Sequence, residues 1–95
     1  MLTHEQLKAK ALENREVREE YERVNREEFA LLDMLLQARR EAGLTQADVA
    51  ARMGTKAPAI ARLERSLASG QHSPSISTVR RYLKACGKHL QLEVI

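Results

Sequence analysis

The most apolar part of the chain is predicted to be a helix over residues 29–42, because its apolar residues recur at helical spacing. One stripe consists of Leu31, Met34, Leu35, Ala38 and Ala42. A second stripe, displaced around the helix axis, consists of Phe29, Leu32 and Leu36. Two stripes indicate a helix that is covered on more than one side. The domain core is expected to cover one side, and the N-terminal arm, a second subunit or another protein the other.

Three shorter helices are predicted after Gly43, which stands where a helix commonly ends in a left-handed residue. The first spans residues 46–53, with Thr45 as its cap and Gly54 at its end. The second starts at Thr55 or Lys56 and runs to about residue 65, and residues 66–73 are predicted to be a loop. The third runs from residue 74 or 75 to residue 86, and its predicted inward side chains are Ile76, Val79 and Leu83, with Tyr82 alongside.

Residues 89–95 alternate between apolar and polar side chains, which is typical of a strand. Leu90, Leu92 and Val94 fall on one face of it. A single strand in a helical chain has no ladder partner, so this pattern predicts pairing across a homodimer. A frayed tail is the alternative.

The first 28 residues are predicted to form an arm of one or two short helices. Thr3 and Gln6 have the spacing of a capping box, and Asn14 and Asn25 are predicted to start further helices. The apolar side chains that share one face here are Val17, Tyr21 and Val24. So narrow a seam cannot order the arm by itself, so we expect it to dock on the domain or on a partner. The alternative is a charged helix that packs weakly.

Charge divides the chain into the same two parts. The full 95 residues carry a net charge of +3. Residues 1–28 contain eight acidic and six basic side chains, a net charge of −2, whereas residues 29–95 contain five acidic and ten basic ones, a net charge of +5. This asymmetry indicates two surfaces with different partners.

Several classes of protein are not expected. The length suits one small domain with an arm, and no apolar run approaches a membrane span or a signal-peptide core. Cys86 is the only cysteine, which excludes an internal disulfide and a multi-cysteine zinc site and favours a reducing cytoplasm. His4, His72 and His89 are scattered without acidic partners, and there is no glycine-rich phosphate loop. We therefore expect no enzyme, no metal and no cofactor.

The two helices around Gly54 have the pattern of a helix-turn-helix. Ala50 is small enough for a close approach of two helices, and the spacing of Val49, Met53, Ile60 and Leu63 would bury them between these helices. Residues 31–86 resemble the Cro/repressor-type (XRE) helix-turn-helix domain, whose fold is lambda-repressor-like. The residues that carry the resemblance are Arg39, Gly43-Leu44-Thr45-Gln46, Val49-Ala50, Met53-Gly54, Ile60-Ala61-Arg62-Leu63-Glu64 and Pro74-Ser75.

The spacing and the resemblance together imply that the helix after the turn enters the major groove of double-stranded operator DNA. The side chains expected to face DNA are Lys56, Ala57, Pro58, Ala59 and Arg62. Arg62 is the expected base reader, because a guanidinium bonds guanine bidentately. Family precedent puts Gln46 on the DNA backbone.

Other residues are candidates for phosphate contacts. Thr45, Ser73 and Ser75 are expected at helix starts, where the backbone N–H groups favour a phosphate. The other interpretation is that these side chains only cap their helices, and the two roles are compatible. Arg65 is basic and is expected either to contact phosphate or to act only as a solubilising charge. Arg39 and Glu64 resemble an internal salt bridge of the family, so a structural role is expected for both.

The arm and the tail resemble HigA-type antitoxins, through Asn14-Arg15-Glu16-Val17-Arg18-Glu19-Glu20-Tyr21 ahead of the Phe-Ala-Leu-Leu helix. This resemblance implies an antitoxin that binds a RelE/HigB-like mRNA-cleaving toxin and represses its own operon. It implies that Val17, Tyr21, Val24 and Phe29 anchor the toxin, and that arm acids such as Glu16, Glu19, Glu20 and Glu22 face a basic toxin surface. A stand-alone XRE-type repressor and a protein-interaction adaptor are the alternatives.

The predicted fold class is all-α. It comprises an arm over residues 1–28, a DNA-binding domain of four to five helices over residues 29–88, and a dimerisation strand over residues 89–95.

Overall fold

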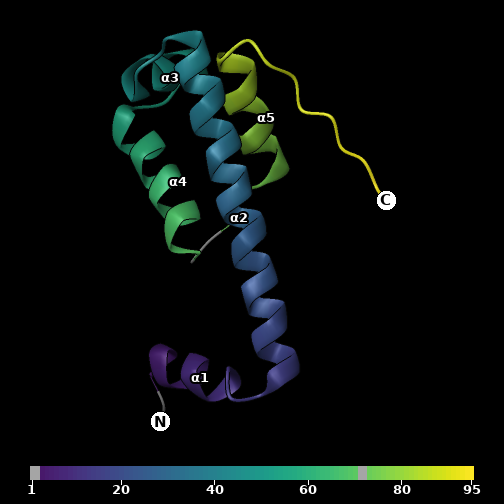
Figure 1. The fold of residues 1–95 in the computed structure, drawn as a ribbon. Helices are drawn as coiled ribbons and strands as arrows, with labels where there is room; N and C mark the ends of the chain where they lie inside the picture. The colour runs from purple at the N-terminus through teal and green to yellow at the C-terminus, as the bar shows by residue number, and fades with distance from the viewer. Residues whose placement is uncertain (1–2, 71–72) are drawn as a thin grey trace.

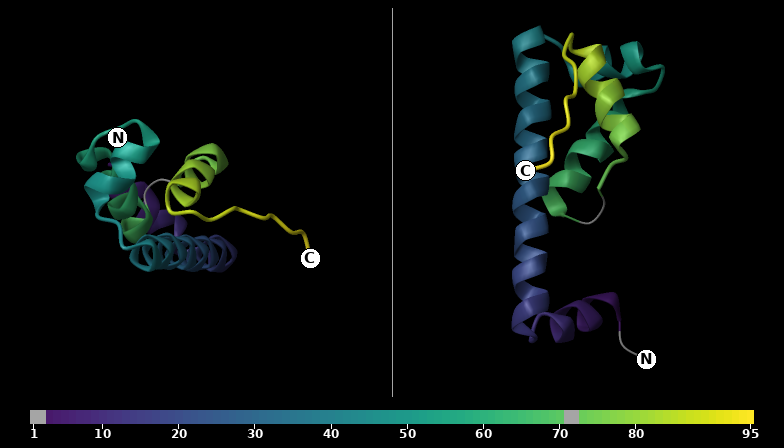
Figure 2. Two further views of the ribbon diagram at one scale, coloured as in Figure 1. Left: turned by 90° about the horizontal axis from the view of Figure 1, so that it is seen from above. Right: turned by 90° about the vertical axis from the view of Figure 1, so that its right-hand side faces the viewer.

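The computed structural model describes residues 3–70 and 73–95, which contain five helices and no strand. The helices are α1 (His4–Ala11), α2 (Arg15–Ala42), α3 (Gln46–Met53), α4 (Ala57–Ser69) and α5 (Ile76–Ala85). Helix α2 is the long spine of the molecule, and α3, α4 and α5 gather around its C-terminal half (Figure 1). Helix α1 lies at the other end of α2, on the same side as α3, α4 and α5 (Figure 2, right). The helical fold class is confirmed over the described residues.

Helix α2 is continuous over 28 residues, so the predicted helix start at Asn25 is wrong. Asn14 is the N-cap, since its side chain accepts from the backbone of Glu16 and Val17, and Gly43 ends the helix at φ +68°. The capping box of Thr3 and Gln6 on α1 is also present. An asparagine costs little inside a helix when its side chain finds another contact, and Asn25 lies against Gly70 at the end of α4.

The core lies between α2 and the three helices that pack on it. The largest of the fully buried side chains are Leu35, Val49, Ile60, Leu67 and Tyr82. Helix α2 contributes Leu32, Leu35 and Ala38, which come from both predicted stripes. Met34 and Phe29 are 43% and 50% exposed, one from each stripe. The core therefore packs against the side of α2 that lies between the two stripes. Met34 and Phe29, on the far edges of the stripes, are exposed to solvent.

Helix α4 is longer than predicted and ends at Ser69 rather than near Arg65. Leu67 explains the difference, because it lies four residues after Leu63, continues the apolar face of the helix and is completely buried. The predicted loop 66–73 is thus wrong over residues 66–69, and its residues 71–72 lie outside the described residues.

Helix α5 begins after its N-cap Ser75 as predicted, but Ile76 does not face the core. Val79, Tyr82 and Leu83 are buried, whereas Ile76 is 53% exposed. Ile76 is the first residue of α5, at the end of the helix that lies farther from α2 (Figure 2, right), and it is not among the described side chains that pack on the core.

The predicted strand at residues 89–95 is wrong for this chain. The segment is extended but pairs with nothing among the described residues, and it leads away from the helices (Figure 2, left). Its first part is held by an ion pair between Lys88 Nζ and Glu41 Oε2 at 3.1 Å and by Leu90, which packs on the core. Leu92 and Val94 are exposed. A strand needs a neighbouring backbone to bond with, and alternation in the sequence cannot supply one.

Candidate nucleic-acid interface

Helices α3 and α4 form the expected helix–turn–helix pair. Val49, Ala50 and Ile60 are buried between them and the rest of the core, and Ala50 is only 1% exposed. Gly54 ends α3 at φ +74°, and the backbone of Thr55 donates to Ala50 O at 2.8 Å. Glycine adopts this left-handed conformation without the strain that a Cβ atom would add. The turn therefore sets the two helices at a defined angle.

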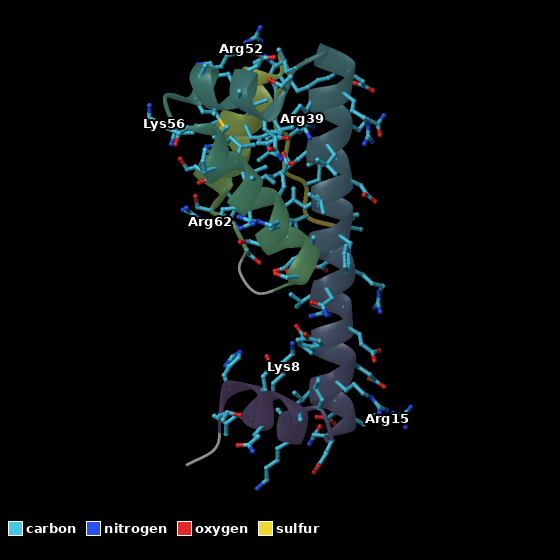
Figure 3. The ribbon with its side chains drawn as sticks, turned by 90° about the vertical axis from the view of Figure 1, so that its left-hand side faces the viewer. Lys8, Arg15, Arg39, Arg52, Lys56 and Arg62 are labelled. Atoms are coloured by element: carbon cyan, nitrogen blue, oxygen red, sulfur yellow. The ribbon has the colours of Figure 1, made fainter. Side chains whose placement is uncertain are left out.

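The start of α4 presents the side chains that were expected to face DNA. Lys56, Pro58 and Arg62 are exposed, and Ala57 and Ala59 are half-buried. Lys56 and Arg62 lie on the side of the domain away from α2 (Figure 3). The N-cap Lys56 makes no side-chain hydrogen bond to the helix start. Pro58 has no N–H and the Ala59 N–H donates to Lys56 O at 2.9 Å, so Ala57 supplies the N–H that this helix start leaves available to an incoming acceptor.

A shallow hollow of about 260 Å³ lies beside Arg62, between α4 and the beginning of α5. Its lining residues are Ala59, Arg62, Leu63, Ser66, Ser73, Pro74 and Thr78. Ser75 stands next to this lining and caps α5, because its Oγ accepts from the Thr78 backbone at 3.1 Å. The structure thus brings Arg62 close to the segment that carries Ser75. Arg65 is exposed one turn further along α4 and has no partner among the described residues.

The start of α3 is occupied by interactions within the chain. Thr45 and Asp48 form a capping box, with the Thr45 backbone donating to Asp48 Oδ2 at 2.9 Å and Thr45 Oγ1 accepting from the Asp48 backbone at 3.1 Å. These bonds hold the pKa of Asp48 below its usual value. Gln46 is half-buried, and its Nε2 donates to Glu64 Oε1 at 3.0 Å. Capping by Thr45 is confirmed, and phosphate contacts by Thr45 and Gln46 stay predictions.

A buried carboxylate ties α4 to the three other helices of the domain. Glu64 is 8% exposed and lies 3.4 Å from Arg39 Nη2 of α2, which confirms the expected salt bridge. Its other oxygen, Oε2, accepts from Tyr82 Oη of α5 at 3.1 Å. Burial, followed by the negative charge of Glu64, raises the pKa of Tyr82 well above its ordinary value. Sequence reasoning missed this role of Tyr82, because helical spacing indicates burial but not a hydroxyl's partner.

Two arginines with no predicted role fasten α3 to α5. Arg52 Nη1 donates to Ala85 O in the last turn of α5 at 2.8 Å, and Arg81 Nη2 donates to Met53 O in the last turn of α3 at 2.6 Å. Each guanidinium therefore satisfies a carbonyl at the C-terminus of the other helix, where positive charge is favoured. This exchange fixes the helix before the turn against the end of the domain.

The predicted partner surface on the arm is only partly open. Val17 and Val24 are 44% and 37% exposed, but Tyr21 is half-buried beneath Lys8 of α1, whose Nζ lies 4.8 Å from the ring centre. Phe29 is exposed, yet it stands five residues after Val24 and so on another side of α2.

The acidic side chains of the arm are partly neutralised by its own bases. Glu19 pairs with Arg15, and Glu20 pairs with Arg23, along the same helix. Glu16 and Glu22 have no ion pair of this kind among the described residues. The acidity expected to face a partner is therefore weaker than the number of carboxylates indicates.

Residues 35–92 match the family model described as helix-turn-helix, which is more than half of the 95-residue chain. No curated protein and no solved structure matches the chain. Within residues 3–70 and 73–95, no helix is long and apolar enough to cross a membrane, and no three His, Cys, Asp or Glu side chains are grouped to hold a metal ion.

Replacing Tyr82 with phenylalanine should destabilise the domain. Tyr82→Phe removes the donor to Glu64 Oε2 and leaves a buried carboxylate oxygen unsatisfied, so we expect the free energy of unfolding to fall by about 1–3 kcal/mol in urea denaturation at pH 7. The raised pKa adds a second expectation. Wild-type stability should decline as the pH rises above about 10, where tyrosine ionises in the unfolded chain, and this part of the decline should be absent in Tyr82→Phe.

Tyr21→Phe on the arm is the matched control for Tyr82→Phe. Its ring is not part of the core, so we expect its free energy of unfolding to stay within about 0.5 kcal/mol of wild type. Equal losses in the two variants would show that the Tyr82 hydroxyl has no special role.

Proposed function

The chain belongs to the helix-turn-helix family, and we propose that it is an autorepressor through this domain and an antitoxin through its N-terminal arm. Family membership supports the coarser part of the proposal, a sequence-specific DNA-binding transcriptional regulator of the XRE type. The observation that carries DNA reading is the exposed start of α4, with Lys56 and Arg62 on one side of the domain (Figure 3). In this role the protein would act in the cytoplasm by binding alone, without a cofactor and without catalysing a reaction.

In this proposal Arg62 bonds a guanine edge in the major groove, and Lys56 reaches guanine or a phosphate. Ala57 and Ala59 offer methyl groups, which suit the methyl group of thymine. The start of α4 has no side-chain cap, and this supports a further contact between the Ala57 N–H and a phosphate oxygen. The +5 charge of residues 29–95 supports binding to a polyanion.

The antitoxin part of the proposal assigns the arm to a RelE/HigB-like mRNA-cleaving toxin. It is supported by the exposure of Val17 and Val24 on a helix that continues well beyond the domain. Apolar side chains that an ordered helix keeps in solvent are commonly covered by a partner. The net charge of −2 on residues 1–28 fits a basic partner, and with two carboxylates already paired its main effect would be on the association rate.

The proposal also includes a homodimer in which Leu90, Leu92 and Val94 contribute to the contact. It is supported by Leu92 and Val94, which are 61% and 101% exposed although both are large and apolar. Two copies would present two α4 helices to a pseudo-palindromic operator with half-sites about one helical turn apart. A stand-alone repressor would use the same surfaces without a toxin, and an adaptor would use the fold without DNA.

Arg62→Ala should weaken binding to a selected operator duplex about 5- to 100-fold and bind random DNA nearly as well as wild type does. Arg15→Ala is the matched control, because Arg15 lies on the opposite side of α2 (Figure 3), and it should bind both duplexes like wild type. Fluorescence anisotropy over a range of salt concentrations measures both, and wild-type affinity should fall steeply with salt. Equal weakening on both duplexes would make Arg62 a phosphate contact, and salt-independent binding would favour the adaptor.

The arm assignment is tested by Val17→Asp combined with Val24→Asp. Charges on the seam should abolish co-purification with the product of a neighbouring reading frame of about 100 basic residues, because burying an unpaired carboxylate is costly. Ala30→Asp, also on the exposed part of α2, is the control and should still co-purify. Point substitutions are preferable to deleting residues 1–28, since that deletion would divide α2. Retained capture by the double variant would contradict the assignment.

The dimer contact is tested by Leu92→Asp combined with Val94→Asp. Sedimentation at low micromolar concentration should show wild type and Gln91→Asp as dimers and the double variant as monomers. A double variant that remains dimeric would place the interface elsewhere on the molecule.

A further inference from the structure

One buried carboxylate on α2 belongs neither to the Glu64 network nor to the expected DNA contacts. Glu28 is only 7% exposed and lies at the middle of α2. Its Oε1 accepts a hydrogen bond from Ser73 Oγ, and its Oε2 is buried without a partner among the described residues. A carboxylate buried in this way costs stability, and leucine would fill a core position without that cost. Stability alone therefore does not explain this residue.

Glu28 and Asn25, one turn apart on α2, hold this helix against two residues of the connection between α4 and α5, namely Gly70 and Ser73. Gly70 ends α4 at φ +68°, and a Cβ atom there would lie 2.4 Å from Asn25 Oδ1 and 3.4 Å from Glu28 Oε2. Ser73, bonded to Glu28, lies within the connection, three residues before α5 begins. Asn25 and Glu28 thus lie against Gly70, the C-cap of α4, and Glu28 also bonds Ser73 of the connection.

This junction sets the geometry of the hollow beside Arg62. Ser73 and Thr78 form one wall of the hollow, and Arg62 and Ser66 form the other. Ser75, the expected phosphate contact, is two residues from Ser73 and is bonded to Thr78. Base reading by Arg62 and phosphate contact at Ser75 need a fixed separation, because both must be made to one rigid duplex. Among the described residues, the hydrogen bond that Ser73 Oγ donates to Glu28 Oε1 joins this wall of the hollow to α2.

We propose that Glu28 is a positioning residue for DNA binding, which acts through Ser73 to hold the start of α5 at its distance from Arg62. Glu28 itself touches no DNA in this proposal, because its carboxylate is buried. The proposal rests on the proposed DNA-binding function and adds to it a residue outside the helix-turn-helix.

A double-mutant cycle in the full chain tests this role. The variants are Glu28→Ala, Ser73→Ala, their combination and Glu28→Gln, each titrated with an operator duplex selected by the wild-type protein from random DNA. We expect each alanine variant to weaken operator binding by about tenfold, and the combination to be no weaker than either one, because both remove the same bond. Glu28→Gln keeps an oxygen that accepts from Ser73, so its affinity should stay within about threefold of wild type.

Ser69→Ala is the matched control, because it removes a nearby hydroxyl whose one bond among the described residues is to Ser66 O within α4. It should bind the operator like wild type. Urea denaturation of every variant separates binding from folding, since a purely structural role would make the loss of affinity follow the loss of stability.

Three results would overturn the proposal. The first is wild-type affinity in Ser73→Ala, which is informative even where Glu28→Ala fails to fold. The second is a combined variant whose loss is the product of the two single losses. The third is a wild-type protein that binds no duplex, which would also overturn the proposed DNA-binding function, whereas the first two leave that function standing.

Discussion

The geometry of the domain depends on the burial of one carboxylate, that of Glu64. Its three bonding partners come from three different helices, namely Arg39 from α2, Gln46 from α3 and Tyr82 from α5. Burying a carboxylate costs stability, and removing the partner of a buried charged pair costs several kcal/mol. All four helices must therefore reach their positions together for Glu64 to be satisfied. Since Glu64 is on α4, this requirement orients the helix that presents Arg62 and Lys56.

Helix α2 uses one face for two purposes. Residues seven apart along it share a face, so Val17 and Val24 on the arm lie in line with Leu31 in the domain, and Tyr21 lies in line with Leu35. In the C-terminal half, α4 and α5 cover this face and bury Leu35 completely. In the N-terminal half, α1 supplies only Lys8 over Tyr21, and α1 has no buried residue of its own. The apolar face of the domain thus continues onto the arm, where Val17 and Val24 stay exposed and favour contact with a partner.

Features that depend on neighbouring residues could be predicted from the sequence, and features that depend on distant ones mostly could not. The caps at Thr3, Asn14, Thr45 and Ser75 follow from side chains bonding to the backbone two or three residues away, and all four are present. The Arg39–Glu64 pair spans 25 positions and was expected only through a family resemblance. Asn25 has the pattern of a cap, but a contact with Gly70 keeps it inside a helix.

The same limit explains the errors at the domain edges. Helix α4 continues past Arg65 because Leu67 finds space in the core, and Ile76 is exposed at the end of α5 that lies farther from α2. The alternation in residues 89–95 describes which side chains would share a face of a strand, but the strand itself needs a second backbone. The Glu28–Ser73 bond spans 45 positions and joins two residue types that are common on surfaces, so no local signal could have marked it.

The sparse chemistry of the first turn of α4 gives these distant contacts a consequence for DNA reading. Ala57, Pro58 and Ala59 carry no side-chain donor or acceptor, so hydrogen-bond readout from this turn depends on Lys56 and Arg62. With few base contacts, a larger part of the binding energy must come from phosphate contacts on flanking elements, which specify register rather than sequence. Register is useful only when those elements stand at fixed distances from the base reader. A domain of this composition therefore needs α4 and α5 at a fixed separation. The Tyr82–Glu64 bond ties α5 to α4 directly, Arg81 ties α5 to α3, and the Ser73–Glu28 bond ties the segment before α5 to α2.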